Sequence, residues 1–155
     1  MENLIIKKDE LVIVIDSKVL CDFISINSSN ETGGVLYGFK VKDMEEYIIS
    51  GCTFPQENDI RTYSTFQRID SKHFKIVNDF WKDDKCTMYF GDWHFHPVDY
   101  VYPSKQDHDS FEMLCKKTKT SSKYIINIIV SKKELRLFVF LKKGSKQILE
   151  QKYLF

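Results

Sequence analysis

The order in which strand-like and helix-like segments follow one another constrains the fold of this chain most strongly. Segments rich in β-branched and aromatic residues predict strands, whereas apolar residues three and four apart predict helices. The predicted strands cover residues 11–16, 33–41, 45–53, 86–96, 124–131, 134–142 and 147–155, and the predicted helices cover residues 17–27, 71–82 and a segment that begins at Ser104. This order, β-α-β-β-α-β-α-β-β-β, predicts an α/β or α+β fold in which helices flank a mixed, mostly antiparallel central sheet.

Length and composition are those of one folded unit. The 155 residues fit a single domain, residues 1–155, and 43% of them are hydrophobic. Only 6 glycines and 3 prolines are present, which excludes a disordered or low-complexity chain. Residues 54–70 form a polar stretch without a clear period, and a loop of that length in a compact domain is often functional.

Charge and apolar patterning exclude two classes of partner. A formal net charge of +1 does not suit a dedicated nucleic-acid-binding protein. No apolar run approaches the roughly 18–20 residues of a membrane span, and residues 1–10 do not resemble a secretory signal. We therefore expect a cytoplasmic protein that binds neither nucleic acid nor membrane. Residues 116–155 hold 11 of the 23 basic residues, either as a basic face for an acidic protein or as lysines that keep strands soluble.

The four cysteines indicate neither a zinc knuckle nor a redox motif. They stand 29 or more residues apart and form no Cys-x-x-Cys pair: Cys21, Cys52, Cys86 and Cys115. We expect reduced cysteines that lie in the core.

The segment from Gly91 to Asp109 carries the chemistry. His94 and His96 end a predicted strand, where residues two apart share a face and stand about 6–7 Å apart at Cα. If Ser104 caps the next helix, Asp107 lies in its first turn and can reach the strand end. Two imidazoles and a carboxylate would hold zinc and leave its fourth position open, which is typical of a catalytic site.

Simpler explanations exist for each of these residues taken alone. Ser104 and Asp107 can be an N-cap and a helix-dipole partner. Asp99, His108 and Asp109 lie close enough in sequence to replace Asp107 as the ligand. The joint pattern favours a metal site, because four required residue types occur at fixed offsets.

The run His94-x-His96-x7-Ser104-x2-Asp107 resembles the signature of the JAMM (MPN+ or JAB) zinc metalloproteases and isopeptidases. That signature includes an upstream glutamate beside a glycine-rich segment, which Glu31 in ETGGVLYG matches. The resemblance implies a JAB/MPN-like, cytidine-deaminase-like fold with zinc held by the two histidines and the aspartate. It also implies that Glu31 is the general base for water and that Ser104 stabilises the oxyanion. Phe95 departs from the family, which usually has Ser or Thr there.

Two further pieces, FPQENDIRTYSTFQR and GDWHFHP, resemble the bacterial JAB subfamily found beside E1-like and E2-like proteins in ubiquitin-like conjugation operons, including antiphage defence systems. This resemblance implies that the substrate is a ubiquitin-like protein or a protein conjugate, with E1-like or E2-like enzymes as further partners. Arg61 and Arg68 are candidates to clamp the substrate's tail, unless residues 54–70 are only a solvated connector.

Two other functions are considered. A non-catalytic MPN-type scaffold is the alternative, but such relatives usually lack a metal ligand. A zinc deaminase would need His-x-Glu and Pro-Cys-x-x-Cys, and the helical metalloproteases need His-Glu-x-x-His, none of which occurs. Precursor processing, cleavage of a conjugate and release of a sulfur-carrier tail stay open.

Overall fold

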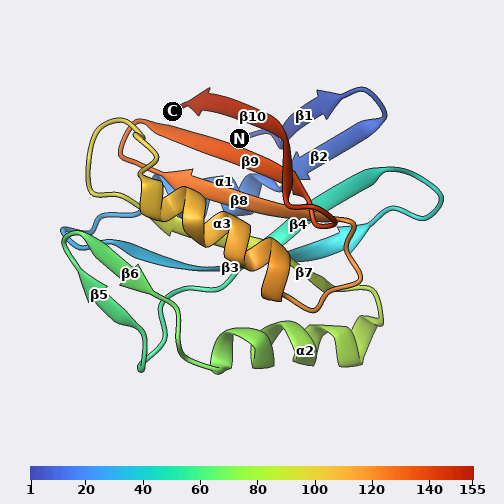
Figure 1. Ribbon diagram of the computed structural model, residues 1–155, viewed down its shortest axis with the longest axis horizontal. Coiled ribbons are helices and arrows are strands. Elements are labelled where there is room, and N and C mark those ends of the chain that lie inside the picture. Colours follow the sequence, from blue (N-terminus) through green and yellow to red (C-terminus); the bar gives the residue numbers. More distant parts are fainter.

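A computed structural model describes residues 1–155, and it shows a large curved sheet with three helices (Figure 1). The elements are β1 (Leu4–Lys8), β2 (Leu11–Ile15), α1 (Ser17–Ile24), β3 (Thr32–Lys40), β4 (Glu46–Cys52), β5 (Ile60–Thr62), β6 (Thr65–Gln67), α2 (Lys72–Asp84), β7 (Met88–Phe95), α3 (Lys105–Lys117), β8 (Tyr124–Val130), β9 (Glu134–Leu141) and β10 (Lys146–Leu154).

Eight strands form one sheet in the order β1-β2-β4-β3-β7-β8-β9-β10. All neighbouring pairs are antiparallel except β2–β4 and β7–β8. The predicted α+β fold with a mixed, mostly antiparallel sheet and flanking helices is therefore confirmed. None of the three helices is long and apolar enough to cross a bilayer.

The helices cover both faces of the sheet, with α1 behind it and α3 in front of it in Figure 1. The larger core cluster joins α1, through Phe23, to one face of the sheet, and it includes Trp93 and Phe95. The smaller core cluster joins α2 and α3, through Val77 and Phe111, to the other face. Trp93 is thus a core residue, as expected, with 1% of its surface exposed.

Three features differ from the sequence prediction. β1 was not predicted, because its apolar residues are few and charged residues follow them; it pairs with β2 across a turn at Asp9. Residues 54–70 contain the short antiparallel hairpin β5–β6. The expectation that all four cysteines are buried is wrong, although all four are free. Cys21 is exposed on the solvent side of α1, and Cys86 is exposed just after the end of α2.

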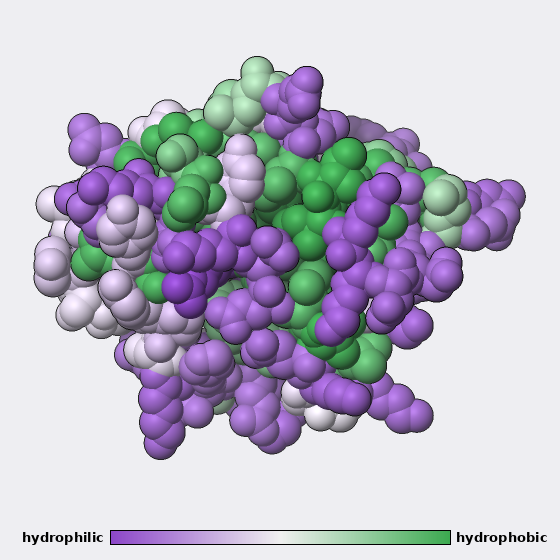
Figure 2. Space-filling view, turned by 90° about the horizontal axis from the view of Figure 1, so that it is seen from above, coloured by the Kyte–Doolittle hydropathy of each residue, from purple (hydrophilic) through white to green (hydrophobic).

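The sheet curls so that its edge strands β1 and β10 approach each other (Figure 1). The Lys8 ammonium on β1 donates a hydrogen bond to the Ile148 carbonyl on β10. Figure 2 looks onto this side and shows hydrophobic side chains gathered within a frame of hydrophilic ones. Ile5 of β1 and Leu154 of β10 are 56% and 59% exposed.

Asp84, the last residue of α2, accepts the hydrogen bonds that hold the turn between α2 and β7, so its replacement tests how much this turn stabilises the fold. Its carboxylate accepts hydrogen bonds from the Thr87 hydroxyl and from the Thr87 and Cys86 N–H groups, and these lower the pKa of Asp84 to about 2. A carboxylate whose pKa is lower in the folded state stabilises the fold above its unfolded pKa of roughly 3.9 and loses this effect as pH falls. Asp84→Asn should therefore lower the melting temperature at pH 7 and flatten its decline between pH 4 and pH 2.

Asp83→Asn is the matched control, because Asp83 is exposed on the same turn. Thermal unfolding of the three proteins across this pH range is the measurement. An unchanged slope in Asp84→Asn would show that these hydrogen bonds do not hold the turn.

Candidate metal centre

The end of β7 presents two imidazoles on one face of the sheet. Side chains alternate along a strand, so His94 and His96 point together while Phe95 points into the larger core cluster. The two ring centroids are 4.7 Å apart. The backbone of His96 is fixed, because its N–H donates to the Val130 carbonyl on β8 at 2.8 Å. Phe95, which stands where the family usually has Ser or Thr, therefore lies on the opposite face of the strand from the histidines.

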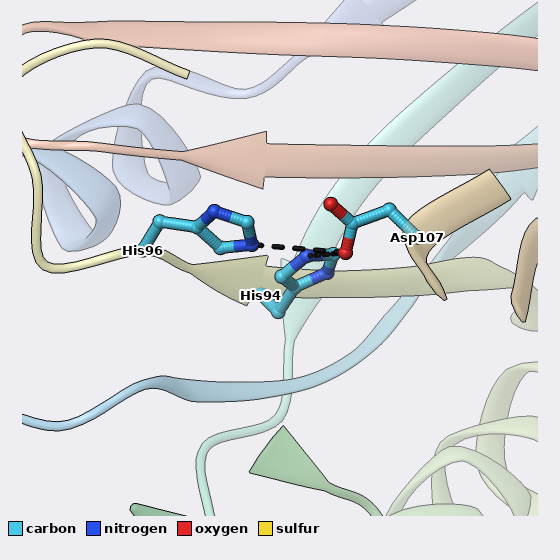
Figure 3. Close-up of side chains that lie close together, drawn as sticks. All are labelled: His94, His96 and Asp107. Carbon is cyan, nitrogen blue, oxygen red and sulfur yellow. Dashed lines mark hydrogen bonds and ion pairs between the residues drawn. The ribbon is translucent and has the colours of Figure 1, made fainter. Parts of the chain in front are cut away.

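Helix α3 brings a carboxylate to the same place. Ser104 is the N-cap: its Oγ accepts from the Asp107 N–H at 3.1 Å, and Asp107 Oδ2 accepts from the Ser104 N–H at 2.7 Å. This capping box leaves the other oxygen free to face the histidines. Asp107 Oδ1 lies 3.0 Å from His94 Nε2 and 3.7 Å from His96 Nε2 (Figure 3). The sequence left a capping role and a metal-site role as alternatives for Asp107. The structure shows that one carboxylate can serve both, since Asp107 takes part in the helix cap and also faces the imidazoles.

The donor atoms of these three residues fit one metal ion. They lie within 4.8 Å of one another, and tetrahedral ligands at 2.0–2.1 Å from zinc would be about 3.3 Å apart. His96 Nε2 is buried and has no hydrogen-bond partner, which a metal would supply. The other two acidic residues of the segment, Asp99 and Asp109, are exposed, and Asp99 pairs with Lys133 at 2.9 Å.

The carboxylates of Asp107 and Glu31 both face the imidazoles, and their charge shifts pKa values within the cluster. Burial by itself would raise the pKa of Asp107, but the hydrogen bond from His94 and the nearby imidazole of His96 outweigh it and hold this pKa far below its usual value. Burial would lower the pKa of His96, but the carboxylates of Asp107 and Glu31 outweigh it and raise the pKa. The two carboxylates thus favour the protonated, positively charged form of the His96 imidazole.

Glu31 stands directly before β3 and faces the cluster from a neighbouring strand. Thr32 pairs with Phe95 in the β3–β7 ladder, which brings the preceding residue level with His96. Glu31 Oε1 lies 3.9 Å from His96 Nε2. Burial raises the pKa of Glu31, although the two nearby imidazoles oppose the rise. A carboxyl with a raised pKa is suited to accept and return a proton near neutral pH.

The β5–β6 hairpin holds Glu31 from both sides. The Glu31 N–H donates to the Thr62 carbonyl at 2.8 Å, and Arg61 Nε donates to the Glu31 carbonyl at 3.2 Å. Phe66 of the hairpin packs over Gly33, where a Cβ would lie 2.6 Å from its ring. Because Gly33 has no side chain, the hairpin can approach β3 beside the cluster.

Arg68 is held by a carboxylate of β7. Its Nε lies 2.9 Å from Asp92 Oδ2, and its guanidinium stands 4.8 Å from the centre of the Phe74 ring. Arg61 is likewise engaged with its own chain. The expectation that the two arginines contact a substrate stays a prediction.

The base of the hairpin is fixed by a buried network that the sequence did not indicate. Asp59 accepts from the N–H groups of Gln56, Ile69 and Asp70. Its Oδ2 is also 2.6 Å from Nε2 of the fully buried His73, whose Nδ1 is 2.5 Å from the Thr53 hydroxyl. No local pattern marks Asp59 or His73, because their contact joins a loop to a helix.

A cleft of about 670 Å³ lies between the hairpin and α3. Its lining includes Glu31, the two histidines and Asp107, together with Arg68 and Asn127. The cluster therefore opens into this cleft.

Comparisons with known proteins place the chain in a family. Residues 23–141 match the family described as prokaryotic homologs of the JAB domain, and the chain belongs to this family. The implied membership of the bacterial JAB proteins is thus confirmed.

The chain is also similar to a curated protein and to solved structures. It is 30% identical over 109 residues to the CD-NTase/cGAS isopeptidase of Escherichia coli (strain TW11681). The match covers 70% of this chain and 66% of that protein, so the chain spans just under two thirds of the relative's length. The solution structure of DSY2949 from Desulfitobacterium hafniense has a TM-score of 0.60 at 19% identity and covers 88% of this chain and 89% of its own, which supports the fold. A JAB1/MPN domain protein from Archaeoglobus fulgidus has a TM-score of 0.41 at 17% identity and covers 87% of this chain and 93% of its own.

Proposed function

We propose that this chain is a zinc-dependent isopeptidase that hydrolyses the amide bond between the C-terminal tail of a ubiquitin-like or similarly conjugated protein and an amine of its target. The observation that carries the proposal is the convergence of two imidazoles and one carboxylate, with the Glu31 carboxyl beside them. Membership of the JAB family and the name of the E. coli relative support it. The complete set of site residues favours this function over a non-catalytic scaffold.

His94, His96 and Asp107 would hold the metal. Zinc bound there would supply Lewis-acid chemistry. The protein orients the ligands: the Ser104 N–H holds Asp107 Oδ2, so that Oδ1 faces the imidazoles. Such outer contacts fix the direction of a ligand and are part of a working site.

Glu31 acts as the general base. It takes a proton from the attacking water and later gives that proton to the leaving amine, which cannot depart as an anion. Its raised pKa and its place beside His96 suit both steps. The hairpin keeps its backbone in position through Thr62 and Arg61.

Ser104 stabilises the developing oxyanion. Its Oγ accepts a hydrogen bond from the Asp107 N–H, so its single hydroxyl proton is left to donate. A donor aimed at the oxyanion of an acyl-transfer step typically contributes about 100- to 1000-fold in rate.

The substrate's tail would lie in the cleft between the hairpin and α3. The strands β5 and β6 form a two-stranded sheet of their own, and an extended chain can pair with such an open edge. In this arrangement Arg61 and Arg68 lie beside the tail. The name of the E. coli relative makes a CD-NTase the first conjugate to test. Following the resemblance to the bacterial JAB subfamily, E1-like or E2-like enzymes in the cytoplasm would supply the conjugate, as in an antiviral defence system.

Chelation tests the proposal. A CD-NTase joined through an isopeptide bond to a lysine of a second protein, and ubiquitin joined in the same way, are incubated with the purified chain. Cleavage of at least one conjugate should occur, stop with 1,10-phenanthroline and return with added zinc. Cleavage that resists chelation, or none of either conjugate by the zinc-loaded protein, would contradict the proposal.

Replacement of the proposed base should separate chemistry from metal binding. Glu31→Gln keeps the size of the side chain but cannot take up the proton, so turnover should fall by about 100- to 10,000-fold. Zinc content, measured by atomic emission, should stay at the wild-type level. Glu57→Gln is the matched control, since Glu57 is 84% exposed and does not line the cleft. Glu31→Gln with normal turnover would contradict the assigned role.

Three variants of Ser104 separate its capping role from its proposed catalytic role. An N-cap Ser→Ala change costs a helix about 1 kcal/mol, whereas Ser→Gly costs only a few tenths. If the hydroxyl stabilises the oxyanion, Ser104→Gly and Ser104→Ala should both lower kcat by about 100- to 1000-fold, and Ser104→Thr should retain most of it. Near-normal kcat in Ser104→Gly would assign the side chain to the cap alone.

A further inference from the structure

Asn127 is a buried polar residue that the proposed chemistry does not use. It lies in the middle of β8 between Ile126 and Ile128, and it is 1% exposed. Neither its Oδ1 nor its Nδ2 has a hydrogen-bond partner. Because buried carboxamides are normally hydrogen-bonded, two polar atoms without a partner in one side chain indicate that a ligand binds there.

The side chain lies on the floor of the cleft. β7 and β8 run parallel, and Trp93 lies opposite Ile128. Asp92 precedes Trp93 and Asn127 precedes Ile128, so these two residues also lie opposite each other. Residues in register on parallel strands share a face, and His94 is on this same face, two residues further along β7. Asn127 and Asp107 both line the cleft. The carboxamide thus lies deeper in the groove that contains the candidate metal centre.

The charged groups nearest to this position are already paired. Asp92 Oδ2 accepts from Arg68 Nε at 2.9 Å, and Asp92 Oδ1 accepts from the Tyr89 hydroxyl at 2.7 Å. Asp92 therefore has hydrogen-bond partners on both oxygens without Asn127. The Asn127 carboxamide is therefore available to form hydrogen bonds with a group that enters from the cleft.

The chemistry of the side chain favours a neutral group that carries both a donor and an acceptor, and the amide is such a group that every polypeptide substrate contains. A carboxylate would satisfy Nδ2 but repel Oδ1, and an ammonium group would do the reverse. An amide offers an N–H for Oδ1 and a carbonyl for Nδ2, so it satisfies both atoms at once. We propose that Asn127 is a specificity residue that binds an amide group of the substrate in the floor of the cleft. That this amide belongs to a substrate rests on the proposed isopeptidase function, whereas the amide binding itself does not.

The amide has two sources, a backbone peptide group or the side chain of Asn or Gln. Two probes distinguish them: N-acetylglycine N-methylamide, which has only secondary amides, and propionamide, which has a primary one. N,N-dimethylacetamide is the matched control compound, because it keeps the carbonyl and lacks the N–H.

Titration of the ¹⁵N-labelled protein with these compounds tests the proposal. The Asn127 side-chain NH₂ signal is assigned by its absence in Asn127→Leu. At least one of the two probes should shift this signal saturably, and N,N-dimethylacetamide should bind at least tenfold more weakly. A stronger response to N-acetylglycine N-methylamide would indicate a backbone group, and a stronger response to propionamide would indicate a side-chain amide. No saturable response to either, or an equal response to the control, would overturn the proposal.

Asn127→Leu gives a second measurement, made on the remaining resonances of the cleft. It should weaken binding of the preferred probe at least tenfold, whereas Ile125→Val on the same strand and face should not. The urea midpoint of Asn127→Leu should equal or exceed that of the wild type, because the leucine replaces two unpaired polar atoms. A lower midpoint together with unchanged probe binding would assign Asn127 to the fold and overturn the proposal. Since no readout requires cleavage, loss of the isopeptidase proposal would leave this result interpretable.

Discussion

The division of the Asp107 carboxylate between two partners is the interaction on which the site depends. One oxygen is held by the N-terminus of α3, and the other faces the imidazoles of His94 and His96. The helix start is thereby fixed relative to the end of β7, since a shift of either element would separate the donors. A helix cap, which many proteins use only for stability, here also sets the geometry of a candidate metal centre.

The β5–β6 hairpin connects this centre to the surface where a substrate would lie. It contacts the backbone of Glu31 on both sides and rests on Gly33, and its base is fixed by Asp59 and His73. A substrate that pairs with the hairpin would therefore act on the segment that positions Glu31, the proposed general base. The proposed binding of substrate and the proposed proton transfer thus share one structural element.

Local patterns predicted the parts of the molecule that depend on neighbouring residues. Seven of the ten strands, the three helices, the Ser104 cap and the common face of the two histidines follow from periodicity and capping rules, which act over a few residues. The position of Glu31 could be expected only from resemblance, because 62 residues separate it from His94 and their contact depends on the β3–β7 ladder.

Features that arise from tertiary contacts were not predictable. The hairpin strands have three residues each, too few for a periodic pattern, and packing over Gly33 stabilises them. The Arg68–Asp92 pair and the Asp59–His73 contact join segments whose approach no sequence spacing reports. Asn127 carried a weak signal, as the one polar residue in the run YIINIIV, but its unpaired atoms appear only in the folded chain.

X-ray absorption spectroscopy of the zinc-loaded protein tests the central claim most directly, because it reports the atoms that surround the metal. The account predicts one zinc ion per chain with about four nitrogen or oxygen neighbours at roughly 2.0–2.1 Å, two of them with the scattering pattern of imidazole. Sulfur neighbours at roughly 2.3 Å, or a shell without imidazole, would place the metal elsewhere and contradict the account.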